Sequence, residues 1–197
     1  MIYIIMQIEY EATFMDVDHN ICRTKLTELW AICIKHEYTQ MRTTFTLPTW
    51  HEIEWWFLRV RDEWDRVTMT LKQFTRDGTM DSQKEIELII DDYTTWVDFL
   101  THIWATPKAI QESKRELREY KWTQIMLDTR PFLETFVEIE WSGEQSVTEL
   151  SNKLWFDRSQ VVFDSVTELY ARRYKISHDR INQHTPTIKF DMENPFL

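Results

Sequence analysis

The sequence is poor in cysteine and has no long apolar run. Its two cysteines, Cys22 and Cys33, match neither a zinc site nor a disulfide framework, and the six histidines form no metal-binding motif. This cysteine usage is typical of a reduced compartment, and we expect a cytoplasmic location. The apolar stretch from Met1 to Ile8 is too short for a signal peptide or a membrane span, so we expect no membrane partner.

Positive charge is also in short supply. The chain has 23 lysines and arginines against 33 acidic residues, and its net charge is −10. Such a surface repels a phosphate backbone, so we expect no nucleic-acid partner. A small anion could still bind if the cations were gathered in one place.

Length and repetition favour one domain. With 197 residues and 43% apolar residues, the chain can bury a substantial core. We expect a single domain over 1–197, with its core in residues 1–175 and a polar C-terminal extension at 176–197. Short motifs containing tryptophan end three helix-like segments, as L-W-A at 29–31, I-W-A at 103–105 and L-W-F at 154–156. This internal repeat is typical of a pseudo-symmetric domain.

Glutamates recur in pairs on strand-like segments. In F-V-E-I-E-W, at 136–141, Glu138 and Glu140 fall on one face and the apolar residues on the other. The same spacing occurs at Glu9 and Glu11, and at Glu85 and Glu87. Alone, such a pair usually marks a sheet with one wet face.

The periodicity predicts a largely antiparallel sheet with helices outside. The expected strands are 1–14, 38–47, 57–61, 67–74, 82–90, 109–120, 124–128 and 136–141. A connection at 49–56 and a turn at 76–78 separate some of them. Helices are expected at 17–29 and after Asp91 or Asp92. Two more should open at the string S-V-T-E-L, with Ser146 and Ser165 as N-caps of capping boxes.

Cations follow the same period of two on neighbouring strands. They are Arg42, Arg59, Arg61, Lys72 and Arg115. If helices cover the apolar side and the sheet closes, the charged face lines a barrel, where unpaired charges are costly. Paired carboxylates suit Mg²⁺ or Mn²⁺, and clustered arginine and lysine suit phosphate oxygens. Together they indicate a metal–polyphosphate ligand.

These residues resemble the CYTH superfamily of triphosphate tunnel enzymes, which includes class IV adenylyl cyclases, thiamine triphosphatases and inorganic triphosphatases. The similarity covers roughly 7 to 175. It rests on E-Y-E-A at 9–12, L-R-V-R at 58–61, Lys72, E-I-E at 85–87, Arg115, M-L-D ending at Asp128, and F-V-E-I-E at 136–140. No single motif is specific, but the set in this order is.

The resemblance implies an α+β fold, an eight-stranded antiparallel β-barrel or triphosphate tunnel with helices packed outside. It implies phosphate binding by the five cations above, with Glu85 and Glu87 completing the acidic wall of the substrate site. It places Mg²⁺ or Mn²⁺ on Glu9, Glu11, Asp128, Glu138 and Glu140, and makes Asp128 and Glu138 catalytic. The substrate would be ATP, thiamine triphosphate or inorganic triphosphate.

Several functions stay open. The first is hydrolysis of the triphosphate by water, and the second is cyclisation of ATP to cyclic AMP. The third is a polyphosphate-binding or redesigned scaffold without turnover. A homodimer is a further open alternative.

Two departures from the family pattern bear on these alternatives. The family's first motif is usually E-x-E-x-K, and Thr13 stands in place of the lysine. The chain also has only two glycines and ten tryptophans. Trp30, Trp104 and Trp155 stand where relatives usually have glycine after a helix, and Trp64 and Trp122 are similarly placed at hairpin turns. A left-handed helix end accepts glycine freely and strains a bulky residue by roughly 1 kcal/mol or more.

Overall fold

The computed structural model describes residues 6–48, 56–74, 79–81, 83–163 and 165–197. The start of the first expected strand, most of the connection expected at 49–56, and the turn expected at 76–78 lie outside the described residues.

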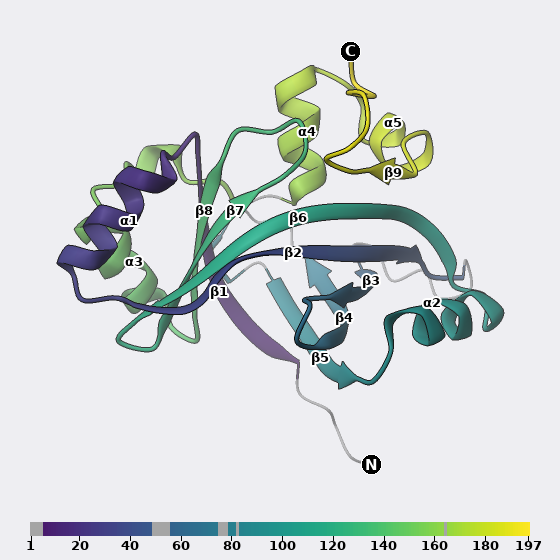
Figure 1. The fold of residues 1–197 in the computed structure, drawn as a ribbon, viewed down its shortest axis with the longest axis horizontal. Helices are drawn as coiled ribbons and strands as arrows, with labels where there is room; N and C mark the ends of the chain where they lie inside the picture. The colour runs from purple at the N-terminus through teal and green to yellow at the C-terminus, as the bar shows by residue number, and fades with distance from the viewer. Residues whose placement is uncertain (1–5, 49–55, 75–78, 82, 164) are drawn as a thin grey trace.

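In the described part of the chain, nine strands form one sheet, and eight of them close into an antiparallel barrel (Figure 1). The barrel order is β2-β3-β4-β5-β1-β8-β7-β6, and pairing of β2 with β6 closes it. The strands are β1 (Gln7–Met15), β2 (Ile32–Thr46), β3 (Trp56–Asp62), β4 (Val67–Phe74), β5 (Gln83–Ile90), β6 (Thr106–Tyr120), β7 (Thr123–Thr129), β8 (Phe136–Trp141) and β9 (Thr187–Ile188), which pairs parallel with β6. The predicted barrel with outer helices is therefore confirmed.

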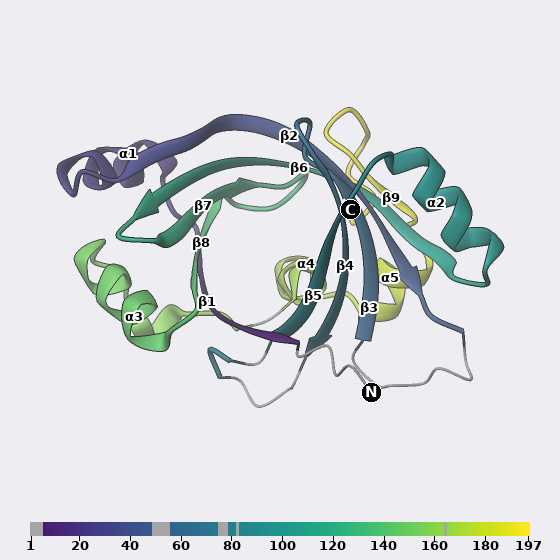
Figure 2. The ribbon, with the colours of Figure 1, turned by 90° about the horizontal axis from the view of Figure 1, so that it is seen from below.

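Helices cover the barrel on several sides. Figure 2 shows α1 (His19–Glu28) and α3 (Glu144–Lys153) beyond one wall, α2 (Tyr93–His102) beyond the opposite wall, and α4 (Val166–Tyr174) and α5 (His178–Gln183) near one end. No helix in the described part of the chain has both the length and the apolar character needed to cross a membrane.

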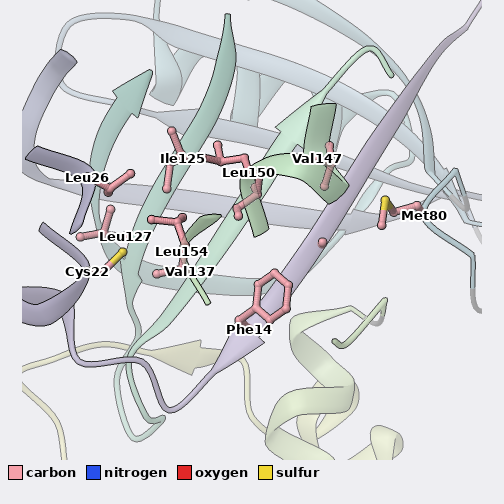
Figure 3. Packing of buried hydrophobic residues seen from close by; sticks show 12 residues of the cluster. Phe14, Cys22, Leu26, Met80, Ile125, Leu127, Val137, Val147, Leu150 and Leu154 are labelled. Carbon is pink, nitrogen blue, oxygen red and sulfur yellow. The ribbon is translucent and has the colours of Figure 1, made fainter. Parts of the chain in front are cut away.

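Alternation along the strands decides what faces outward. Phe14, Ile125, Val137 and their neighbours of the same parity pack against the apolar side of α1 and α3, as Figure 3 shows. A second cluster joins α2 to β2 and β3 through Phe45, Val60 and Leu100. Because successive side chains of a strand point to opposite faces, this burial turns the charged residues of the same strands into the barrel.

A third cluster fixes the C-terminal segment. Tyr170 of α4, Ile181 of α5, Ile188 of β9 and Phe196 are buried together. The Tyr170 hydroxyl donates a hydrogen bond to the Pro131 carbonyl oxygen at 2.8 Å. These contacts hold α4 against the segment between β7 and β8.

Most predicted elements are confirmed, and the differences lie at their ends. β2 begins at Ile32 instead of the expected residue 38, because pairing with β6 continues up to Glu119. The Asp92 side chain caps α2 as predicted. Ser146 is not an N-cap, because α3 already begins after Gly143. Ser165 does precede α4, but its side chain makes no capping hydrogen bond, so neither capping box forms.

The five tryptophans expected at left-handed positions occupy them. Their φ angles are 61° for Trp30, 73° for Trp64, 76° for Trp104, 71° for Trp122 and 62° for Trp155. All five side chains are exposed. After α1, the Ala31 N–H donates to the Leu26 carbonyl and the Trp30 N–H to the Thr27 carbonyl, which is the Schellman pattern.

Candidate functional site

The barrel encloses a cavity of about 900 Å³, here called the tunnel cavity. Eleven charged residues predicted from the sequence line it. They are Glu9, Glu11, Arg42, Arg59, Arg61, Lys72, Glu85, Glu87, Arg115, Glu138 and Glu140. Asp128 is not among the lining residues; its carboxylate lies behind Arg115.

Three glutamates form the tightest acidic group in the described part of the chain. Glu9 and Glu11 of β1 and Glu140 of β8 each offer a carboxylate oxygen, and these oxygens lie within 4.8 Å of one another. The antiparallel register places Glu11 directly opposite Glu140. Burial, and then repulsion from Glu138, raises the pKa of Glu11 to about 7, and burial and Glu9 raise the pKa of Glu140 to about 8. The three carboxylates are therefore crowded in the absence of a cation.

Lys72 of β4 lies beside this group. Its Nζ is 2.9 Å from Glu9 Oε2 and 3.0 Å from Glu85 Oε2. Burial opposes its charge, but the two carboxylates outweigh burial and raise the Lys72 pKa. Gln83 links the lysine to Glu11, because its amide accepts from Lys72 and donates to Glu11 Oε2 at 3.0 Å. Lys72 is thus a fixed charge in the wall of the cavity.

Arg115 of β6 is held by two carboxylates. Its Nε and Nη2 donate to the two oxygens of the buried Asp128, at 2.7 and 2.5 Å, and Nη2 also reaches Glu138 Oε2 at 2.6 Å. Burial would lower the pKa of Arg115, but Asp128 and Glu138 outweigh it and raise that pKa well above its usual range. This bidentate geometry fixes the plane of the guanidinium at the cavity surface.

Arg59 and Arg61 project from β3 on the same face. Arg59 donates to Thr70 Oγ1 at 3.0 Å and lies 3.9 Å from Glu87 Oε2, which is also 3.9 Å from Arg61. Glu63, which follows β3, pairs with Arg61. The Nε atoms of both arginines are buried without a hydrogen-bond partner among the described residues. Burial, and then Arg61, lowers the pKa of Arg59 to about 10.

Four further cavity residues were not predicted: Arg130, Glu63, Gln83 and Gln111. Arg130 and Glu63 lie just beyond the ends of β7 and β3, at the same parity as the cavity-lining residues of those strands. Gln83 and Gln111 stand on β5 and β6 at the inward parity, but they are uncharged, and the prediction named charged residues alone. For all four, the period of two was the available signal.

Thr13 lies on the inner face of β1. It is buried, and its hydroxyl donates to Glu11 Oε1 at 3.4 Å. The register sets it opposite Glu138 of β8. A longer side chain at this position would therefore start between two acidic residues.

The comparisons with known proteins place this geometry in a family. The CYTH domain family matches residues 55–169, and no curated protein matches the chain. A conserved hypothetical protein from Pyrococcus furiosus has a TM-score of 0.70 and 17% identity, covering 82% of this chain and 99% of its own. A candidate adenylate cyclase from Vibrio parahaemolyticus has a TM-score of 0.73 and 10% identity, covering 84% and 98%.

A third structure with the same fold carries a different described activity. A candidate adenylyl cyclase from Hippeastrum, described as having a dominant triphosphatase activity, has a TM-score of 0.53 and 13% identity, covering 87% of this chain and 97% of its own. At these identities the likenesses show the fold alone. The family match spans more than half of the chain and covers six of the eight barrel strands, β3 to β8. The chain therefore belongs to the CYTH domain family.

Proposed function

We propose that this protein binds a triphosphate-containing substrate in the tunnel cavity and hydrolyses it with the help of Mg²⁺ or Mn²⁺. The observation that carries the proposal is the arrangement of charge across the cavity. A group of three carboxylates, Glu9, Glu11 and Glu140, shares the cavity with inward-facing arginines. A polyphosphate with a divalent cation complements both sets.

The acidic group fits a hard divalent cation. All its donors are carboxylate oxygens, the ligands that Mg²⁺ and Mn²⁺ prefer, and the raised pKa values of Glu11 and Glu140 reflect crowding that a cation would relieve. The bound metal would supply charge neutralisation at the phosphate oxygens. Asp128 and Glu138, also expected as metal ligands, stand close to Arg115, and their role toward the metal stays a prediction.

The arginines would position the phosphates. Arg59 and Arg61 have buried Nε–H groups without partners among the described residues, so phosphate oxygens can accept from them without displacing a protein acceptor. Arg115 is oriented by Asp128, which gives this carboxylate a positioning part in catalysis. Charged hydrogen bonds of this kind hold the substrate and oppose the negative charge that accumulates on it during phosphoryl transfer.

Glu138 is the proposed general base. Its pKa is raised by burial and then by Asp128, which makes it a better proton acceptor than an ordinary glutamate. A water oxygen attacks the terminal phosphorus and loses its proton to Glu138. The bridging P–O bond breaks, and its electron pair leaves with the remaining diphosphate.

A product assay tests the proposal. Purified protein is incubated with ATP, thiamine triphosphate or inorganic triphosphate, each with Mg²⁺, with Mn²⁺ or with a chelator. Release of orthophosphate that needs metal supports hydrolysis, whereas cyclic AMP formation from ATP would assign the cyclase activity instead. Binding in calorimetry without any product would identify a polyphosphate-binding protein, the alternative that Thr13 favours.

A further inference from the structure

Arg42 and Arg130 line the tunnel cavity, and neither has a hydrogen-bonded carboxylate among the described residues. Arg42 of β2 donates only to the neutral amide of Gln111, with its Nε 2.9 Å from Oε1. Arg130 is 6% exposed, lines the cavity, and its Nε has no hydrogen-bond partner in the described part of the chain. Its guanidinium carbon lies 6.0 Å from the centre of the Phe136 ring.

The other buried cations of the cavity are neutralised within the protein. Lys72 has Glu9 and Glu85, and Arg115 has Asp128 and Glu138. Asp128 attracts Arg130, but both of its oxygens are already bound by Arg115. Arg42 and Arg130 therefore differ from their neighbours in lacking a dedicated carboxylate.

The two guanidinium groups also disfavour each other. Arg130 is the nearby charge that most lowers the pKa of Arg42, after burial itself. Both act on the hydroxyl of Tyr170, which places them together beneath α4. Arg130 is buried and Arg42 is partly buried, and two such like charges without a hydrogen-bonded carboxylate are costly unless an anion binds between them.

The first turn of α4 faces the same space. Ser165, Thr167 and Glu168 line the tunnel cavity, and the Ser165 side chain makes no capping hydrogen bond. The start of a helix carries a partial positive charge and N–H groups without helical acceptors. Glu168 at this turn is engaged by Arg172 and His178, at 2.8 and 2.6 Å. The helix start thus adds to the positive potential near Arg42 and Arg130.

We propose that Arg42 and Arg130 form an anion subsite at the end of the tunnel cavity beneath α4, which holds the terminal phosphoryl group of the substrate. This inference rests on the proposed function and adds Arg130 to the substrate-binding residues. It also orients the substrate. The end of the phosphate chain lies under α4, and any organic group points toward the other end of the barrel.

The experiment compares R130M with R173M, in which an arginine of α4 paired with Glu134 outside the cavity is changed. Calorimetry with inorganic triphosphate gives affinities, and thermal unfolding is recorded in chloride, in orthophosphate and in triphosphate. We expect R130M to lose about tenfold or more in triphosphate affinity, as loss of a charged hydrogen bond implies, and R173M to bind as the wild type does. R130K should recover part of the loss.

Thermal unfolding separates binding from structure. In chloride, R130M should melt at or above the wild-type temperature, because the repulsion between Arg130 and Arg42 is removed. Triphosphate or orthophosphate should raise the melting temperature of R130M less than that of the wild type. Equal affinity in R130M and wild type, or a melting temperature far below that of R173M, overturns the subsite.

The test does not depend on turnover. If the wild-type protein binds triphosphate without hydrolysing it, the proposed hydrolysis is refuted. The comparison of R130M with the wild type still tests the anion subsite in that case. The subsite is refuted if triphosphate and orthophosphate raise the melting temperature of the wild type by no more than they raise that of R130M.

Discussion

At the residue scale, the carboxyl groups of Glu11 and Glu140 control how the tunnel cavity responds to pH. Their pKa values of about 7 and about 8 arise mainly from burial and from neighbouring glutamates. In the unfolded chain these groups would ionise at ordinary acidic pH. Folding therefore raises their affinity for protons, which is the opposite of the effect on Glu85 and Asp128, whose pKa values are lowered.

The sign of the stability change follows from proton binding. Between the ordinary glutamate pKa and about 8, the folded protein binds more protons than the unfolded chain, so the free energy of unfolding falls as pH rises. We expect metal-free protein to lose melting temperature from about pH 5 to about pH 8, and the E11Q/E140Q variant to lose much less. Thermal unfolding with a chelator measures this, with the exposed E149Q as control. If the melting temperature of the wild type changed with pH as little as that of the double variant, the raised pKa values of Glu11 and Glu140 would be refuted.

Thr13 offers a second test at the residue scale. Its inward position between Glu11 and Glu138 supports the register that the alternation predicted for β1. A lysine there would place an ammonium group beside the cavity. The two carboxylates would offset part of the free-energy cost of burying that charge. We expect T13K to strengthen triphosphate binding by about 1.5–3 kcal/mol, roughly tenfold or more, through charge-assisted hydrogen bonds.

The control for this substitution is T39K, which adds the same charge at an exposed position of β2 outside the cavity. Calorimetry with inorganic triphosphate compares the two variants with the wild type. An equal effect of both lysines would show a general charge effect, and no effect of T13K in a folded protein would count against a triphosphate in the cavity.

At the scale of elements, helix and hairpin ends combine bulky side chains with left-handed backbone. Trp30, Trp104 and Trp155 follow α1, α2 and α3, and Trp64 and Trp122 lie in hairpin turns. Their rings are 70% to 89% exposed, so little burial offsets the strain. Tryptophan therefore stands at five sites whose backbone conformation favours glycine, in a chain with only two glycines.

Replacing these tryptophans with glycine should stabilise the protein. We expect W30G, W64G, W104G and W122G each to raise the free energy of unfolding by about 0.5–1.5 kcal/mol, since relief of strain exceeds the added flexibility of the unfolded chain. W155G should gain less, because Lys25 Nζ lies 4.4 Å from the Trp155 ring centre. Denaturant unfolding measures the effects.

Trp96 supplies the matched control. It lies inside α2 and packs against the cluster of Phe45 and Val60, so W96G should destabilise the protein. Loss of stability at the left-handed sites as well would refute the strain argument.

The same scale shows what the sequence could predict. Strand alternation identified the inward charges of β1, β3, β5 and β8, because a period of two links each position to one face. It could not place the start of β2, where Ile32 and Ile34 are exposed and pairing with β6 sets the length. It reaches Arg130 only if the period of two is extended past the end of β7, which the sequence alone does not justify.

At the scale of the whole molecule, positive charge is concentrated in the tunnel cavity. Among the described residues, nine of the chain's 23 basic residues line the cavity, but only eight of its 33 acidic residues do. The rest of the chain is correspondingly more acidic. The cavity is therefore close to neutral, and an anion meets less repulsion there than over the rest of the chain.

The balance of charge inside the cavity makes a last prediction about metal removal. The eight carboxylates nearly cancel the nine cations, so a polyphosphate entering without metal meets as much repulsion as attraction. We expect a chelator to weaken binding of inorganic triphosphate by tenfold or more, about 1.4 kcal/mol or above. Above about pH 8, where Glu11 and Glu140 are ionised, the E9Q/E11Q/E140Q variant should bind triphosphate more tightly than the wild type in chelator, because negative charges are gone, yet its affinity should gain little from Mg²⁺. Calorimetry of both proteins with and without Mg²⁺ gives the four affinities. If Mg²⁺ increased the triphosphate affinity of both proteins equally, the metal would not bind at Glu9, Glu11 and Glu140.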